Sequence, residues 1–202
     1  MPVMKIRGGG GDLDLVEYEF TSFSPGENIR PCGLKKDYPL APVSGTVVAR
    51  APARIHLTVL DMNRFSPDRP GGGGGIGFAI GGVYCTAEVE CTPSGLEIDY
   101  TREPILRHFA EAFRQVVGYT GGFKIRARDH QYEHVGLGST STILIAAANA
   151  LNAAVGSPLT SDQLRLLLGC NFVEETVAGN VAFGGVRDRR RPRGRAATAA
   201  WW

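Results

Sequence analysis

Residues 134–148 have the sequence His134-Val135-Gly136-Leu137-Gly138-Ser139-Thr140-Ser141-Thr142-Ile143-Leu144-Ile145-Ala146-Ala147-Ala148. The two glycines would allow the backbone to approach a ligand without an intervening Cβ, and the hydroxyl residues can cap a helix and add donors. Unpaired N–H groups and the positive dipole end at a helix start favour phosphate. The stretch therefore predicts an anion-binding loop that opens a buried helix, with ordinary helix capping as the alternative.

The surrounding sequence predicts an α+β fold. Alternation of apolar and polar residues or short apolar runs predict strands at 15–20, 46–49, 54–60, 76–80, 83–90, 96–100 and 123–128. Helical spacing or start signals predict helices at 104–117 and 163–168, and a further helix that follows the glycine loop and ends at 154, with a resumption over 172–176 left open. The short turns between the early strands favour antiparallel pairing, and the order of elements differs from that of a doubly wound sheet.

Composition indicates a globular protein outside the membrane. Hydrophobic residues make up 43% of the 202 residues and charged residues 21%, which predicts a sizeable core. Asn149 and Asn152 interrupt the longest apolar run, which is too short to span a bilayer. No N-terminal stretch resembles a secretion signal, so a cytoplasmic location is expected.

The four cysteines are expected to be reduced structural thiols. They form no Cys-x-x-Cys pair and have no histidine at zinc-finger spacing. Cys85 and Cys91 are expected to share one extended segment, where six residues separate them by about 20 Å, well beyond the reach of a disulfide.

Two motifs in the right order resemble those of one family. Residues 52–63, followed by Gly74-Gly75-Ile76-Gly77-Phe78-Ala79-Ile80, resemble the first motif of β-ribofuranosylaminobenzene 5'-phosphate synthases. His134-Val135-Gly136-Leu137-Gly138-Ser139 with Thr142 resembles their second motif. These synthases belong to the GHMP kinase superfamily. The resemblance implies a GHMP-type N-terminal domain over 45–184, with a mixed or antiparallel sheet and helices on one face.

The resemblance also implies a chemistry: condensation of a hydroxybenzoate or aminobenzoate with phosphoribosyl pyrophosphate, with release of carbon dioxide and pyrophosphate, in a methanopterin-type pathway. The loop would stabilise charge on the departing pyrophosphate. The residues implied to bind it are Gly136, Leu137, Gly138, Ser139, Thr140 and Ser141.

Three side chains are candidates for catalysis, each with a structural alternative. Arg54 would neutralise a phosphate or an aromatic carboxylate, or else form a salt bridge at a strand edge. His56 is a candidate through its place in the first motif, although a structural histidine is the favoured interpretation. His134, directly before the loop, would donate to an anion.

Two other functions remain open. In an ATP-dependent small-molecule kinase of the same superfamily, the loop would hold the nucleotide phosphates, and Ser139 and Glu174 would bind Mg²⁺. Glu174 and Glu175 would otherwise form a solvated helical face. The third hypothesis is an inactive fragment or a noncatalytic binder of phosphate ligands. All three predict a phosphorylated small-molecule partner and no membrane partner, and they leave open whether the protein forms a homodimer.

The two ends of the chain differ in composition from the predicted domain. Residues 1–44 are weakly patterned and are expected to be an extension or linker. Residues 185–202 contain six arginines and one aspartate between 187 and 195, so the rest of the chain carries −3 against a total of +2. Nucleic-acid binding would rest on this tail alone and is not expected.

The tail begins where the superfamily needs its third glycine motif. A frameshift or truncation is therefore favoured over a selected basic arm, with the C-terminal GHMP domain missing and the chain alone poorly soluble or inactive.

Overall fold

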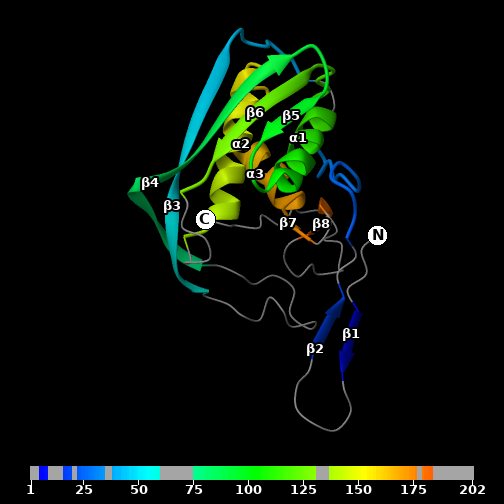
Figure 1. Cartoon of the computed structure of the whole chain (residues 1–202), viewed down its shortest axis with the longest axis vertical. Coiled ribbons are helices and arrows are strands. Elements are labelled where there is room, and N and C mark those ends of the chain that lie inside the picture. The colour runs from blue at the N-terminus through cyan, green and yellow to red at the C-terminus, as the bar shows by residue number, and fades with distance from the viewer. Residues whose placement is uncertain are drawn as a thin grey trace.

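The computed structural model describes residues 5–8, 16–19, 22–34, 38–59, 75–130, 137–176 and 179–183 (Figure 1). In chain order the elements are β1 (Lys5–Gly8), β2 (Val16–Glu19), β3 (Thr46–Val59), β4 (Gly75–Thr92), β5 (Leu96–Asp99), α1 (Glu103–Val117), β6 (Gly122–Arg128), α2 (Ser139–Ala154), α3 (Ser161–Cys170), β7 (Val173–Glu175) and β8 (Val181–Phe183). The predicted α+β class is confirmed. No helix among these residues is long and apolar enough to cross a membrane.

A four-stranded mixed sheet in the order β3-β4-β6-β5 forms the centre of the fold. The β3–β4 and β4–β6 pairs are antiparallel. The antiparallel pairing expected across the short turn between β4 and β5 is not seen, because β6 lies between these two strands. The β5–β6 pair is parallel, because α1 carries the chain from the end of β5 back to the start of β6. The helices lie on one face of the sheet (Figure 1), and α2 packs against β3 and β4.

Strands β3 and β4 are each continuous where the sequence predicts two separate strands. Pro52 pairs with Tyr84, whereas the next residue, Ala53, pairs with Ile80, so residues 81–83 of β4 bulge out of the ladder. The bulge accommodates residues 81–83 outside the pairing, so both strands continue past this point. Since β3 is an edge strand, it tolerates the missing N–H of Pro52.

The core lies between the sheet and the helices. Cys85, Ala87 and Val89 of β4 are buried, whereas the intervening residues are more exposed, as strand alternation requires. Helix α1 buries an apolar stripe that includes Phe109 and Phe113, and it ends at Gly118, whose φ of +74° forms the predicted left-handed stop. Helix α2 is apolar on most sides and buries most of its residues.

Helix α3 begins as predicted but does not resume after residue 170. Thr160 and Gln163 form a reciprocal capping box at its start. At its end the buried Asn171 side chain donates from Nδ2 to the carbonyl oxygens of Leu167 and Arg30, both at 2.9 Å. The chain then forms strand β7, which pairs with β8, so the open alternative of a helix over 172–176 is wrong.

Residues 22–34, here called the N-terminal clasp, pack against the domain although the sequence assigns them to an extension. The backbone groups of Phe23 and Val181 exchange two hydrogen bonds of 2.9 Å. The Arg30 N–H donates to Asn171 Oδ1 at 2.9 Å, and the Arg30 guanidinium lies 3.3 Å from the ring centroid of Phe183. The clasp thereby covers the ends of α3 and β8.

A disulfide joins the clasp to α3, which corrects the expectation that all four thiols are reduced. Cys32 and Cys170, 138 residues apart in sequence, are bonded with a Cα–Cα distance of 6.5 Å. Spacing within one strand could exclude only the pair Cys85 and Cys91, which are indeed unbonded. The return of the clasp across α3 creates the proximity that local spacing does not show. Residues 184–202, with the arginine-rich tail, lie outside the described residues.

His108 of α1 is enclosed beneath the clasp. It is fully buried, its Nδ1 accepts from the Gly26 N–H at 3.2 Å, and its ring contacts that of Phe23 with centroids 5.4 Å apart. Its Nε2 has no hydrogen-bond partner among the residues described. Burial, with a smaller effect of Arg30, lowers the pKa of His108 from 6.5 to about 4. The fold therefore holds this imidazole neutral.

We predict that the protein becomes less stable as the pH falls, because His108 takes up a proton only in the unfolded chain. Between pH 6.5 and about 4 the unfolded chain binds a proton that the folded chain does not, so the free energy of unfolding decreases as pH falls, by up to roughly 3 kcal/mol. His108→Asn keeps an acceptor near the Nδ1 position but cannot titrate, so it should flatten this dependence. Urea unfolding of both proteins from pH 7 to pH 4 measures it, and equal slopes would contradict the prediction.

Candidate functional site

The predicted loop ends at an uncapped helix. Gly138 is the N-cap residue of α2 with φ +68°, and within the described part of the chain no side chain caps the first turn by a hydrogen bond. The Gly138 carbonyl oxygen instead accepts from Ser141 Oγ at 3.1 Å and from Thr142 Oγ1 at 2.9 Å. These hydroxyls hold the turn together but do not neutralise the positive end of the helix, which stays suited to an anion.

Arg54 brings the first motif to the second. Its backbone N–H donates to the Leu137 carbonyl oxygen at 3.2 Å, so the edge of β3 supports the loop. Its side chain lies against Gly138, because a Cβ built on that glycine would be 2.9 Å from Arg54 Nε and 3.2 Å from Arg54 Cγ. The absence of a side chain at Gly138 therefore lets a cation lie at the start of α2.

The charge of Arg54 has no counter-charge among the described residues. The ion pairs between them involve other side chains, so the strand-edge salt bridge considered from the sequence is not seen there. Burial lowers the pKa of the Arg54 guanidinium, although arginine stays charged at neutral pH. A partly desolvated guanidinium beside a helix N-terminus is matched by a phosphate or carboxylate.

A second arginine at the loop was not anticipated from the sequence. Arg102, just before α1, donates from Nη1 to Thr140 Oγ1 at 2.6 Å and from Nη2 to Glu174 Oε2 at 3.0 Å. Its Nε is 3.9 Å from Glu175 Oε2. These partners are 38 and 72 residues away in sequence, so no local spacing signals the contact.

The described residues do not form a ready Mg²⁺ site. The carboxylate of Glu174 is engaged by Arg102, and no group of three or more His, Cys, Asp or Glu side chains could hold a metal ion within the part of the chain described. Mg²⁺ usually takes one or two carboxylates together with substrate phosphates. Glu174 would have to leave Arg102 before it could bind a metal in this way.

The structure brings some of the predicted site residues close together. Leu137, Gly138, Ser139, Thr140 and Ser141 lie at the start of α2, and Arg54 lies beside them. The backbone of His56 belongs to β3 and pairs with Gly77, but its side chain is outside the described part. His134 and Gly136 are also outside it, so their predicted roles stay predictions.

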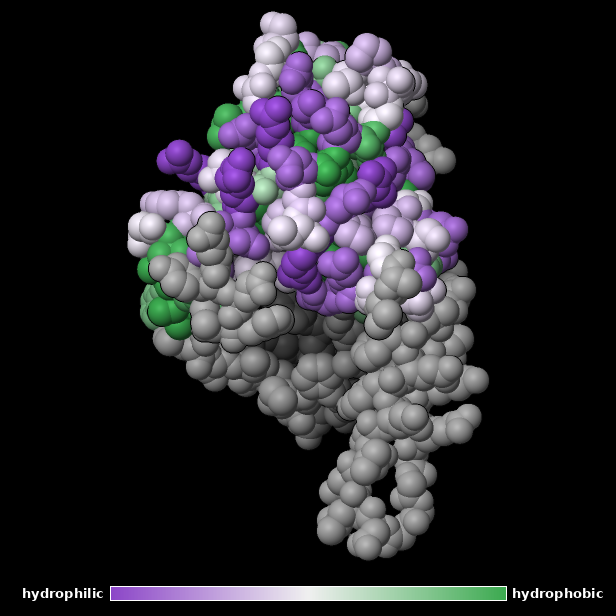
Figure 2. Space-filling model, in the orientation of Figure 1, coloured by the Kyte–Doolittle hydropathy of each residue, from purple (hydrophilic) through white to green (hydrophobic). Residues whose placement is uncertain are grey.

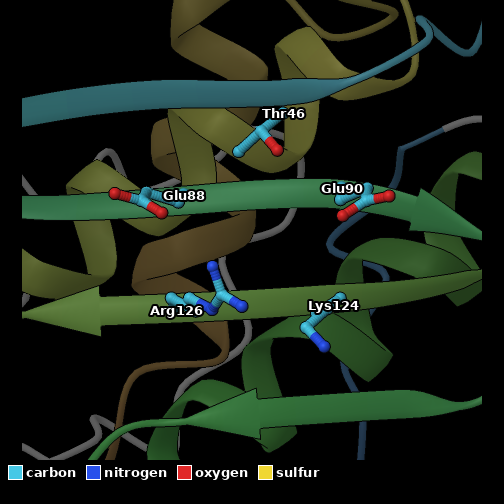
Figure 3. A pocket seen from close by; sticks show the side chains of 5 residues that line it. All are labelled: Thr46, Glu88, Glu90, Lys124 and Arg126. Atoms are coloured by element: carbon cyan, nitrogen blue, oxygen red, sulfur yellow. The ribbon is translucent and has the colours of Figure 1, made fainter.

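The opposite face of the sheet is largely hydrophilic (Figure 2). A shallow pocket there is lined by side chains of three strands, Thr46, Glu88, Glu90, Lys124 and Arg126 (Figure 3). Glu88 pairs in register with Arg126 and Glu90 with Lys124, and Lys124 Nζ lies 2.6 Å from Glu97 Oε1. Because opposite charges face one another across the strands, this surface stabilises the sheet and offers little net charge to a ligand.

Comparison with known proteins supports the superfamily resemblance. The family described as GHMP kinases N terminal domain matches residues 103–186, which include the loop and α2. A curated relative, the beta-ribofuranosylphenol 5'-phosphate synthase of Archaeoglobus fulgidus, is 32% identical over 126 residues, covering 59% of this chain and 37% of the relative. The resemblance predicted from the two motifs is confirmed. The chain spans little more than a third of that relative's length.

A solved structure supports the fold. Homoserine kinase from Cytophaga hutchinsonii superposes with a TM-score of 0.50 at 15% sequence identity, covering 64% of this chain and 41% of the kinase. At this identity the likeness shows the arrangement of the elements alone. The GHMP-type fold predicted from the motifs is confirmed.

We predict that Gly138→Ala both strains the loop and displaces Arg54. A left-handed conformation costs alanine about 1–2 kcal/mol, and the new Cβ would also overlap the Arg54 side chain. Gly33→Ala is the matched control, because Gly33 has φ +74° but open space around its Cβ position. Both variants should unfold at lower urea concentration. Only Gly138→Ala should weaken binding of inorganic pyrophosphate, measured by calorimetry, by about tenfold or more; equal affinities of the two variants would contradict this.

Proposed function

We propose that this chain provides the phosphate-binding part of a GHMP-type transferase that condenses a hydroxybenzoate or aminobenzoate with phosphoribosyl pyrophosphate. The observation that carries the proposal is the partly buried Arg54 guanidinium, which lies on Gly138 at the uncapped start of α2 without a counter-charge among the described residues. Such a site favours a ligand that carries several negative charges. The pyrophosphate group of the sugar donor meets this requirement.

In the proposed reaction the bond between ribose C1 and the pyrophosphate oxygen breaks, and its electron pair leaves with pyrophosphate. The aromatic carbon that carries the carboxylate forms a bond to C1, and loss of carbon dioxide returns the electron pair of the C–C bond to the ring. Arg54 and the N–H groups at the start of α2 would stabilise the charge that develops on the leaving oxygen. Their fixed positions would make this stabilisation available without rearrangement.

The comparison with the Archaeoglobus fulgidus relative supports the synthase over other chemistries. That protein's name specifies a ribofuranosylphenol 5'-phosphate as product, and its similarity covers 59% of this chain. The complete activity is proposed for this chain, since it spans only part of the relative. A methanopterin-type pathway is proposed on the same ground.

The alternative is an ATP-dependent small-molecule kinase, with Ser139 and Glu174 as proposed Mg²⁺ ligands. The observation that favours it is the position of Glu174, which one arginine links to the first turn of α2. The ion pair with Arg102 would have to open before Glu174 could bind a metal. A noncatalytic binder of phosphate ligands would share the loop but release no product.

We predict that the chain binds phosphoribosyl pyrophosphate more tightly than ATP with Mg²⁺, and that Arg54→Gln weakens binding of phosphoribosyl pyrophosphate by about tenfold or more. Calorimetry with each ligand measures both effects. Arg50→Gln is the matched control, because it removes an equal charge from an exposed position on the same strand.

Product assays then distinguish between the synthase, the kinase and the third hypothesis. Pyrophosphate release with phosphoribosyl pyrophosphate and a hydroxybenzoate supports the synthase. Formation of ADP from ATP with candidate alcohols would instead identify a kinase. Binding of phosphoribosyl pyrophosphate without release of pyrophosphate would favour the third hypothesis, an inactive fragment or a noncatalytic binder.

A further inference from the structure

Thr140 has an unusual polar environment for a residue in the first turn of a helix. Its Oγ1 lies 2.6 Å from Arg102 Nη1, and the same guanidinium contacts Glu174 at 3.0 Å and Glu175 at 3.9 Å. Three separate parts of the fold therefore meet at one arginine: the residue before α1, the first turn of α2, and strand β7. Part of this cluster is withdrawn from solvent, because the Arg102 side chain is 28% exposed.

The direction of the hydrogen bond follows from the chemistry of the two groups. A guanidinium has only donors, so the Thr140 hydroxyl must be the acceptor. The hydroxyl keeps its own proton for a second bond, and no other described residue accepts it. A hydroxyl that accepts a charge-assisted bond becomes a better donor, because hydrogen bonds in a chain polarise one another.

The two carboxylates of β7 keep Arg102 in this position. An exposed arginine loses considerable side-chain entropy when it is held in one conformation. Here Glu174 and Glu175 contact the guanidinium from β7, while Thr140 contacts it from α2. The carboxylates also offset the charge of Arg102, so its main effect on a ligand passes through the hydroxyl and not through direct attraction.

We propose that Arg102 is a positioning residue that fixes and polarises the Thr140 hydroxyl as a hydrogen-bond donor to the phosphate ligand of the loop. The inference rests on the proposed function, since it assumes that an anion binds at the start of α2. It assigns Arg102, outside both motifs, to the binding of that anion. It also gives Glu174 and Glu175 the task of orienting Arg102.

A double-mutant cycle tests whether Arg102 acts through Thr140. The variants are Arg102→Gln, Thr140→Val and the combination, and the probe is inorganic pyrophosphate measured by calorimetry. Each single variant should weaken binding by about tenfold, and the double variant should also weaken it by about tenfold. Independent contributions would instead multiply to about a hundredfold, which would overturn the inference.

Two controls separate this role from general effects. Thr140→Ser keeps the hydroxyl and should stay within about threefold of the unmodified chain. Arg126→Gln removes an equal charge from the opposite face of the sheet and should leave pyrophosphate affinity unchanged. If Arg102→Gln fails to fold, the comparison of Thr140→Val with Thr140→Ser still tests the hydroxyl, and equal affinities would overturn the inference.

The outcomes distinguish this inference from the proposed function. Pyrophosphate binding that is lost in Arg54→Gln but unchanged in Arg102→Gln would overturn the role of Arg102 and leave the proposed function intact. Absence of pyrophosphate binding by the unmodified chain would overturn both.

Discussion

The close contact between Arg54 and Gly138 is the constraint on which the site depends. A strand edge and a helix start can approach this closely only where no Cβ lies between them, and Gly138 provides both that space and the left-handed turn before α2. The hydrogen bond from the Arg54 N–H to the Leu137 carbonyl then fixes the loop against β3. Two segments far apart in sequence thereby form the proposed anion site.

The same helix serves both the core and the site. Because α2 is buried along most of its length between the sheet and the other helices, its first turn is held rigidly at the edge of the domain. Burial of residues such as Ile143 and Leu144 thus positions the polar turn that precedes them. Orientation of donors before a ligand arrives is the main way in which a protein stabilises developing charge.

The sequence predicts the parts of this structure that depend on local pattern. Helical spacing and Gly118 define α1, and the glycine loop with its hydroxyl residues locates α2. The sequence could not reveal the contacts of Arg102, because these depend on how α1, α2 and β7 meet in three dimensions. For the same reason it missed the bond between Cys32 and Cys170. The roles of His56 and His134 stay predictions.

The N-terminal clasp changes where this domain must be considered to begin. A boundary at residue 45, drawn from composition alone, would separate Arg30 from Asn171 and Phe183 and would remove Cys32 from its partner. The Asn171 amide would lose two of its partners, and the aromatic rings under the clasp would meet water. A fragment intended to represent the isolated phosphate-binding domain should therefore retain residues from 22 onward.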